Sequence, residues 1–573
     1  MRLSKIYLII FTLLLISWNS IHSKYPTDYF DLPLDRAIFL SGTFGELRPG
    51  HFHSGIDIKS INGKSGEKVT ASADGYIERI KVSPGGYGNA IYIAHPNGYT
   101  TVYAHLDHFT ETVAAYVKDK QYELKRFAVD LYPKPNQFQF KKGQLIGYMG
   151  NSGSSSGPHL HFEIRRSSGQ VPINPFLFGL QVTDKVRPDL GTLQVSYLSE
   201  KFEQIRLREY PLIRTGPGKY TIADTLSEGA WRTGFALKTT DKMDGVPNRN
   251  GIYQLEMQVD DEPRFSFSLD EVPFSKTRYL NAHIDYAAKQ NKKGYYHRCF
   301  KLPGNALDIY STQKNNGVVK LFSNRTQKVS IAVNDINGNI SDLTFYIKRD
   351  IAMFESKSIA APFSIDNLSS LTITKSNLNC AIPKGALYAQ TGIYYRKENS
   401  IPGTYAATYH IGSKEIPLHK YISISIKPEG ISYANLNNAF IARYDEDEGE
   451  LISYGGKYDN GSITASTREF GAYTIGIDTI PPLIKPVQFS SKMQGASRMR
   501  FAITDNMKTG GKARGLRYEA HVDGNWILME YDAKKDVLTH WFDERIEPGN
   551  HELVLKVRDD CGNETVLSKS FVR

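Results

Sequence analysis

The chain has 573 residues, of which 40% are hydrophobic and 12% aromatic, and its formal net charge is +10. This length exceeds what one hydrophobic core can organise, so we expect three to five domains of about 100–200 residues each. The composition excludes a disordered chain, and the basic residues form no dense run of the kind that marks a nucleic-acid site. A mild excess of positive charge suits an anionic polymer.

The N-terminus has the pattern of a secretory signal peptide. A positively charged start precedes an apolar run from Ile6 to Trp18 and a small polar exit that ends at Ser23. Such a run is too short for a comfortable membrane span. We therefore predict that residues 1–23 are cleaved and that the mature protein is exported, either periplasmic or secreted, without stable insertion in a membrane.

Residues 24–182 predict an almost entirely β domain. Its strand from Tyr99 to Leu106 follows a tight turn at Pro96-Asn97-Gly98. Regular alternation places His105 on the face of Tyr103 and places Ala104 on the opposite face. We expect the strand to hold His105 rigidly, as a catalytic side chain requires.

The connection from Asp107 to Lys142 is longer than a minimal domain of this kind needs. Its apolar residues fit a helix near Val113 and Val117, followed by two strands around a proline-rich turn. We expect an ordered wall or lid beside a substrate groove, with basic side chains that meet substrate carboxylates. The alternative is a solvated surface hairpin.

The stretch Gly157–Arg165 carries a His-Leu-His-Phe-Glu motif on a short predicted strand. Because side chains alternate along a strand, His159, His161 and Glu163 share one face. The intervening apolar residues, Leu160, Phe162 and Ile164, face a core. This pattern predicts a metal-binding or catalytic face that is supported by packing.

Two earlier motifs complete the candidate site. His53 and Asp57 stand four residues apart, and His105 lies in a Tyr-Ala-His-Leu stretch. Two imidazoles and a carboxylate are ligand types of a catalytic Zn²⁺, which keeps a fourth position for water.

This ordered set of motifs resembles the lysostaphin-type (LytM-like) zinc endopeptidases. By that resemblance His53, Asp57 and His161 bind one Zn²⁺ per chain, and His105 and His159 form the catalytic pair, whose two roles remain undivided. The resemblance implies a LytM-like antiparallel β catalytic domain. It also implies an exported zinc metalloendopeptidase that hydrolyses peptide bonds in the stem cross-links or bridges of peptidoglycan.

Two other functions remain open. One is a non-catalytic LytM-like module that binds the cell wall or activates an amidase, and the other is an exported endopeptidase acting on glycine-rich proteins.

Among the residues near the motifs, we expect His51 at the rim and His108 at a helix start. Glu163 either orients a ligand or lies on the surface, and Asn89 either caps a turn or lines the groove.

The rest of the chain predicts β domains with an internal repeat. Residues 183–349 and 478–573 read as Ig-like β-sandwiches, the first with an insertion, and residues 350–477 as a β domain of unknown type. An aspartate opens each copy, and two further aspartates recur at matching places: Asp184 and Asp478, Asp241 and Asp505, Asp335 and Asp559. We expect these domains to serve binding or spacing, with envelope proteins as possible partners, and to be dispensable for the chemistry.

Cysteine usage agrees with a fold that does not depend on disulfides. Cys299, Cys380 and Cys561 are far apart in the sequence and form no Cys-x-x-Cys pair. We expect all three in protein cores.

Overall fold

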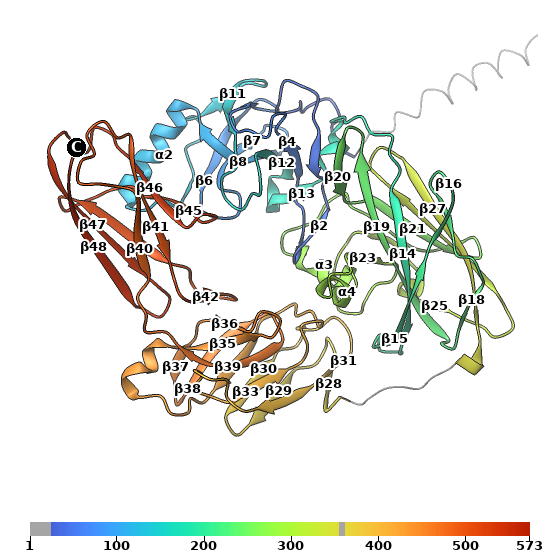
Figure 1. Cartoon of the computed structure of the whole chain (residues 1–573). Helices are drawn as coiled ribbons and strands as arrows, with labels where there is room; N and C mark the ends of the chain where they lie inside the picture. Colours follow the sequence, from blue (N-terminus) through green and yellow to red (C-terminus); the bar gives the residue numbers. More distant parts are fainter. Residues whose placement is uncertain (1–23, 354–360) are drawn as a thin grey trace, which may run out of the picture.

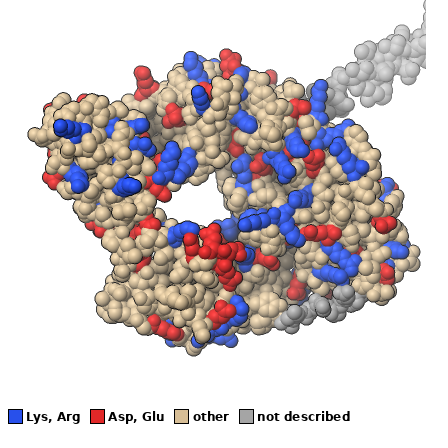
Figure 2. All heavy atoms as spheres, in the orientation of Figure 1, with Lys and Arg blue, Asp and Glu red and all other residues tan. Residues whose placement is uncertain are grey.

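The structure is a computed structural model that describes residues 24–353 and 361–573, so the predicted signal peptide lies outside the described residues. The prediction of a mainly β protein is confirmed. Four β-rich parts follow one another around a ring (Figure 1), and an opening passes through its centre (Figure 2). We label them by the predicted boundaries as the N-terminal (24–182), second (183–349), third (350–477) and fourth (478–573) domains.

One eleven-stranded antiparallel sheet builds the N-terminal domain, in the order β1-β4-β12-β8-β7-β6-β10 with β5, β9, β11 and β13 paired at its sides. Its strands are β1 (Leu40–Gly42), β4 (Ile56–Lys59), β5 (Lys68–Thr70), β6 (Gly75–Val82), β7 (Asn89–Ala94), β8 (Tyr99–Phe109), β9 (Val129–Leu131), β10 (Gln139–Phe140), β11 (Leu145–Met149), β12 (His159–Arg166) and β13 (Val171–Ile173). The alternating apolar side chains of β12 are fully buried in the core on one face of this sheet. The opposite face of β12 is therefore free to carry polar side chains.

Neighbouring strands bring the three motifs together. β12 lies between β4 and β8, so that His161 is opposite Asp57 on one side and Ala104 on the other. Residues directly opposite each other on paired strands share a face. The pairing of β4, β12 and β8 therefore gathers side chains that are about a hundred residues apart in the sequence.

The predicted alternation fails at His105. Ala104 shares the face of His161, and Tyr103 packs into the core, so regular alternation would turn His105 toward the core. His105 instead has a φ of +61°, and the register of β8 against β7 shifts nearby. This irregularity turns His105 to the face of His161, and the next residue, Leu106, returns to the core.

The connection after β8 begins with the predicted helix. This helix is α2 (Glu111–Leu124), which buries Val113 and Val117. The two strands that follow, β9 and β10, do not pair with each other as a hairpin, because both pair with β6. The connection is thus part of the sheet on one side and a surface helix on the other.

The second domain is a sandwich of two sheets around one core. Its sheets are β15-β14-β19-β20 with β23 and β25, and β16-β17-β27-β26-β21-β22-β24 with β18. The bounds are β14 (Asp189–Leu198), β15 (Gln204–Pro211), β16 (Ile213–Gly216), β17 (Lys219–Thr221), β18 (Leu226–Glu228), β19 (Arg232–Met243), β20 (Val246–Asn250), β21 (Gln254–Val259), β22 (Glu262–Ser268), α3 (Leu280–His283), α4 (Tyr286–Gln290), β23 (Tyr296–Arg298), β24 (Tyr310–Gln313), β25 (Val319–Lys320), β26 (Gln327–Asn334) and β27 (Ile340–Arg349).

The third domain also places two sheets over one core, β29-β30-β34-β38-β37 and β32-β33-β39-β35-β36, beside the small pair β28-β31. Its bounds are β28 (Phe363–Ile365), β29 (Leu371–Lys375), β30 (Leu378–Ile382), β31 (Thr391–Ile393), β32 (Tyr395–Glu398), β33 (Thr408–Ile411), β34 (Ile422–Ile426), β35 (Ala439–Asp445), β36 (Glu450–Ser453), β37 (Lys457–Asp459), β38 (Ser462–Thr467) and β39 (Gly471–Ile477). Cys299 and Cys380 are buried in cores, and Cys561 is half-buried.

The fourth domain repeats the strand pairing of the second. The pair β40-β41 matches β14-β19, and the sheet β44-β43-β47-β48 matches β22-β21-β26-β27. The bounds are β40 (Leu483–Gln488), β41 (Arg498–Thr504), β42 (Lys508–Thr509), β43 (Arg517–Val522), β44 (Asn525–Trp526), β45 (Glu530–Asp532), β46 (Val537–Trp541), β47 (Asn550–Arg558) and β48 (Glu564–Val572). The short strand β42 pairs with β36 and so joins the fourth domain to the third.

The N-terminal and second domains share packing. Strands β2 (Leu47–Arg48) and β3 (His51–Phe52) form a small hairpin whose apolar side chains enter the core of the second domain. Met243 of the second domain is buried in turn in the N-terminal core. Residues on both sides of position 182 therefore stabilise one another.

The fourth domain closes the ring on α2. Tyr122 packs against Trp526 with ring centroids 5.3 Å apart, and Lys118 forms an ion pair of 2.6 Å with Asp543. Lys534 donates to the carbonyl oxygens of Asn151 and Ser155 in the loop before β12. The helix predicted as a substrate lid is thus a docking surface for another domain of the same chain.

Candidate metal centre

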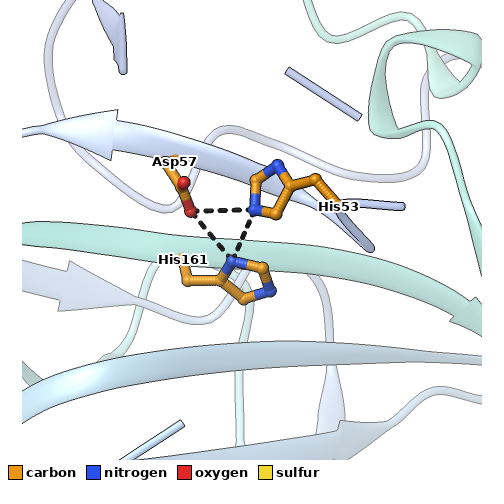
Figure 3. A group of neighbouring side chains, drawn as sticks. All are labelled: His53, Asp57 and His161. Carbon is orange, nitrogen blue, oxygen red and sulfur yellow. Dashed lines mark hydrogen bonds and ion pairs between the residues drawn. The ribbon is translucent and has the colours of Figure 1, made fainter. Parts of the chain in front are cut away.

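Three buried side chains from β12 and the segment around β4 converge on one point (Figure 3). Nε2 of His53 lies 3.0 Å from Oδ1 of Asp57 and 3.0 Å from Nδ1 of His161. Nδ1 of His161 lies 2.9 Å from the same carboxylate oxygen. Each residue offers one ligand atom, and these atoms lie within 4.8 Å of one another, so the group fits a metal site.

The second nitrogen of each imidazole is held by an acceptor behind the site. Nδ1 of His53 donates to the carbonyl oxygen of Thr43 at 2.8 Å, and Nε2 of His161 pairs with Oε1 of Glu163 at 2.7 Å. When the imidazole is neutral, such a contact sets the tautomer and turns the unprotonated ring nitrogen toward a metal. The arrangement is therefore a donor set with its supporting contacts in place.

Glu163 is the centre of that support. It is fully buried, and its carboxylate accepts from Tyr87 at 2.6 Å, Ser54 at 2.8 Å and Arg165 at 2.6 Å. Burial opposes its ionisation, but the Arg165 guanidinium and His161 hold the pKa of Glu163 well below its usual range. Of the two positions that the sequence left open, Glu163 is therefore not on the surface but is buried behind His161.

A guanidinium that sequence reasoning missed contacts the other carboxylate oxygen of Asp57. Arg48 reaches Oδ2 at 2.9 Å and also pairs with Glu46 at 3.0 Å. A β-carbon at Gly42 would lie 2.4 Å from the Arg48 side chain and 2.7 Å from Oδ2 of Asp57, so a larger residue there would displace this ion pair. The only sequence signal was the position of Arg48 in the Gly-Glu-Leu-Arg-Pro entry to the first motif.

Neighbouring side chains keep the Asp57 carboxylate ionised. Burial alone would raise its pKa, but His53, together with His159 and His161, holds the pKa of Asp57 well below its usual range. The carboxylate is therefore ionised at neutral pH and available as an anionic ligand.

His105 and His159 lie side by side at the edge of the group, with ring centroids 4.8 Å apart. Nδ1 of His105 donates to the carbonyl oxygen of Ser152 at 2.9 Å, and Nδ1 of His159 is within 2.9 Å of the carbonyl oxygen of Gly157. Nε2 of His159 is 3.4 Å from Asp57. Burial, followed by the nearby imidazoles of His161 and His159, lowers the pKa of His105 to about 3, so that ring is neutral at pH 7.

The remaining candidate residues lie outside the convergent group. His51 is exposed and its Nδ1 is 3.1 Å from the carbonyl oxygen of Pro49. His108 stacks on Tyr148 at 4.3 Å. Asn89 donates to the carbonyl oxygens of Leu106 and Asp107, and it lines a cleft of about 1140 Å³ between the N-terminal and fourth domains.

Comparison with known families identifies the domain that carries this group. The model for peptidase family M23 matches residues 51–122 and 131–175, and a Zu5-like domain model matches residues 365–478. The N-terminal domain is an M23 (LytM-type) peptidase domain. The family resemblance predicted from the sequence is confirmed, whereas the predicted insertion is mostly within the family match, because only residues 123–130 lie between its two segments.

Three proteins illustrate what this chain is similar to. The DD-carboxypeptidase/endopeptidase Mpg of Neisseria meningitidis is 33% identical over 166 residues, which are 29% of this chain and 32% of Mpg. The murein hydrolase activator NlpD of Escherichia coli is 34% identical over 136 residues, 24% of this chain and 28% of NlpD. The catalytic domain of lysostaphin from Staphylococcus simulans is 24% identical with a TM-score of 0.19, covering 25% of this chain and 91% of that domain.

The two curated relatives match only part of this chain, 29% and 24% of its length. This chain spans about a third of the length of the curated relatives that it matches. The names of those relatives include both a cell-wall hydrolase and a hydrolase activator. The family therefore indicates a peptidase fold associated with the cell wall, and the activity of this chain has to be argued from its own residues.

Proposed function

We propose that this protein is an exported zinc metalloendopeptidase that hydrolyses peptide bonds in the stem cross-links or bridges of peptidoglycan. One observation carries the proposal: two imidazoles and a carboxylate converge within 4.8 Å, beside two further histidines. The matched family and the names of relatives that act on murein or carry endopeptidase activity support the substrate class.

In this proposal His53, Asp57 and His161 hold one Zn²⁺ per chain. The mixture of neutral nitrogen donors and one carboxylate suits zinc, and the buried acceptors behind both imidazoles match the support that zinc ligands have in proteins. When bound, zinc supplies a Lewis acid that polarises a peptide carbonyl and acidifies water.

His105 and His159 supply proton transfer. With Nδ1 engaged by the carbonyl oxygen of Ser152, neutral His105 presents Nε2 as a proton acceptor toward the site. His159, whose Nε2 lies 3.4 Å from the Asp57 carboxylate, is the second histidine of the pair, and we assign it the donation of a proton to the leaving amine. This division assigns the general base to His105 and the general acid to His159.

The non-catalytic alternative is a cell-wall module that activates another hydrolase, as the name of NlpD describes for that protein. It requires no intact metal set and no catalytic pair. All five side chains are present here, and each ring nitrogen that faces away from the site has an acceptor. We therefore prefer the catalytic function.

The export and the envelope location remain part of the proposal. In the described part of the chain, no helix is long and apolar enough to cross a membrane. The three C-terminal domains would then place the enzyme on the wall or against other envelope proteins.

Mass spectrometry of muropeptides released from purified cell wall tests the proposal. Full-length protein should release cut peptides, and a chelator should abolish the release until zinc is restored. The variants His53→Ala and Asp57→Ala should retain less than a tenth of a zinc ion per chain and should release no products. Stoichiometric zinc in either variant, or chelator-resistant cleavage by the wild type, would contradict the assignment.

A further inference from the structure

A second group of acidic side chains lies where the M23 domain joins the second domain. Asp184 follows the end of the M23 domain, Asp241 stands near the end of β19, and Asp335 follows β26 directly. One carboxylate oxygen from each lies within 4.8 Å of those of the other two. None of these residues contributes to the zinc centre.

The structure leaves oxygen atoms in this group without partners. Asp241 is 4% exposed, and its Oδ1 has no hydrogen-bond partner in the described part of the chain. Asn250 is also 4% exposed, and its Oδ1 likewise has no hydrogen-bond partner among the described residues. Burying an unpartnered carboxylate or amide oxygen is unfavourable unless another group compensates it.

A cavity of about 20 Å³ lies among these oxygens, and Asp184, Asp241, Asn250 and Asp335 line it. That volume is enough for a single small ion or a water molecule. Burial and the neighbouring Asp335 raise the pKa of Asp241 to about 8, which agrees with a carboxylate that lacks a compensating positive charge. Hard oxygen donors of this kind select Ca²⁺ or a similar cation over zinc.

The other aspartates are held rigidly. The carboxylate of Asp335 accepts from the backbone N–H of Asn339 at 2.8 Å and from its side chain at 2.6 Å. The same Asn339 side chain donates to the carbonyl oxygen of Asp184 at 3.1 Å. These contacts fix the Asp335 carboxylate and the backbone of Asp184 beside the cavity.

We propose that Asp184, Asp241 and Asp335, with the amide oxygen of Asn250, bind one Ca²⁺ at the junction between the M23 and second domains. The cavity is also lined by Leu40, Thr43 and Phe44 of the M23 domain. A cation there joins the linker after the M23 domain to the second sandwich. It also stiffens the segment that leads to His53.

The fourth domain repeats this arrangement at the junction that follows the third domain. Asp478, Asp505 and Asp559 form the matching group, and Asn563 contacts the carbonyl oxygen of Asp478 at 2.9 Å and Asp559 at 2.7 Å, as Asn339 does in the second domain. Asp505 is only half-buried, so we confine the proposal to the buried copy. The repeat shows that the geometry is a property of the duplicated domain.

Calcium titration of the full-length, zinc-loaded protein tests the proposal. Isothermal calorimetry should detect at least one bound Ca²⁺ per chain, and the melting temperature should rise on adding Ca²⁺. The isosteric variant Asp241→Asn should lose one Ca²⁺ equivalent, or bind it at least tenfold more weakly, with unchanged zinc content. Asp224→Asn removes an exposed carboxylate from the same domain and should bind Ca²⁺ as the wild type does.

The wild-type titration can still overturn the proposal if Asp241→Asn fails to fold. No Ca²⁺ bound to the wild type at millimolar concentrations would overturn the proposal. Calcium binding by folded Asp241→Asn with wild-type stoichiometry and affinity would overturn it as well, since the cation would then lie elsewhere. Neither result bears on the peptidase, whose zinc content and cleavage are measured separately.

Discussion

At the scale of single residues, the proposed zinc centre depends on side chains that contact its proposed ligands. Glu163 joins His161 to Tyr87, Ser54 and Arg165, and Arg48 holds the second oxygen of Asp57. Both residues are charged, and both act through a ligand. Their loss is therefore expected to weaken metal binding more than it alters the fold of the sheet.

Replacing Glu163 by glutamine tests this support. The amide keeps the size of the side chain but cannot supply the negative charge that pairs with the outward nitrogen of His161. We expect zinc affinity to fall by about 10–100-fold, which is typical for loss of such a contact. Competition with a chromophoric chelator measures it, and Glu123→Gln, on the exposed face of α2, serves as the control. Wild-type affinity in Glu163→Gln would show that Glu163 is only a packing residue.

Removal of His105 should separate chemistry from metal binding. Its ring lies beside His159 and its Nδ1 contacts a backbone carbonyl, so His105→Ala should retain zinc. Loss of a general base typically lowers turnover by about 10²–10⁴-fold. Zinc analysis and muropeptide cleavage on the same sample give both readouts. Loss of metal equal to that in His161→Ala would make His105 a ligand instead.

At the scale of secondary structure, the hairpin β2-β3 connects the peptidase chemistry to the second domain. Leu47 and Phe52 are buried in the second core, and the backbone N–H of Phe52 donates to Thr277 at 2.8 Å. The next residue is His53. The expectation that residues 184–573 are dispensable for chemistry did not include this packing, which places His53, a proposed zinc ligand, next to the core of another domain.

Truncation tests the dependence. A fragment of residues 24–182 leaves the hairpin without the core that buries Phe44, Leu47 and Phe52, so we expect a lower melting temperature and reduced zinc content. A fragment of residues 24–349 keeps that core and should retain zinc. Equal zinc content and stability in the two fragments would restore the view that the later domains only place the enzyme.

A single substitution tests the same dependence on the second domain within the full chain. Phe52→Ala removes a side chain that is 3% exposed, and large-to-small changes of a buried phenylalanine cost about 3–5 kcal/mol. Denaturant unfolding should show a loss of this order, with faster release of zinc. The exposed Phe322 in the second domain is the matched control, and Phe322→Ala should change stability by less than about 0.5 kcal/mol.

At the scale of the whole molecule, the four domains close a ring in which α2 meets the fourth domain. The contact combines the pair of Tyr122 and Trp526, the guanidinium of Arg545 4.2 Å above the Tyr122 ring, and the ion pair of Lys118 with Asp543. The aromatic contacts supply most of its expected stability, because partly exposed ion pairs contribute about 0–1 kcal/mol.

We therefore expect that removing a few side chains of this contact opens the ring. The double variant Lys118→Ala, Tyr122→Ala should increase the radius of gyration in small-angle scattering while zinc content stays the same. Lys120→Ala is the control, because Lys120 pairs with Glu123 within the same helix. Unchanged scattering from the double variant would show that other contacts hold the ring closed.

The sequence by itself determined the parts of the site that depend on local pattern. Alternation along β12 set His159, His161 and Glu163 on one face, because a strand has a period of two residues wherever its hydrogen bonding is regular. The ordered motifs identified the M23 domain, and the recurring aspartates marked the duplicated domain whose matching strand order the structure shows.

Only the tertiary structure decided the features that depend on contacts between distant segments. The face of His105 follows from a left-handed residue within β8, which no pattern of apolar residues encodes, because the partner strand decides where a register shift falls. The role of Arg48 depends on the position of Asp57 in β4, and the roles of the β2-β3 hairpin and α2 depend on packing between domains. Local sequence carries the period of each strand, whereas the surfaces buried between domains depend on segments more than a hundred residues away.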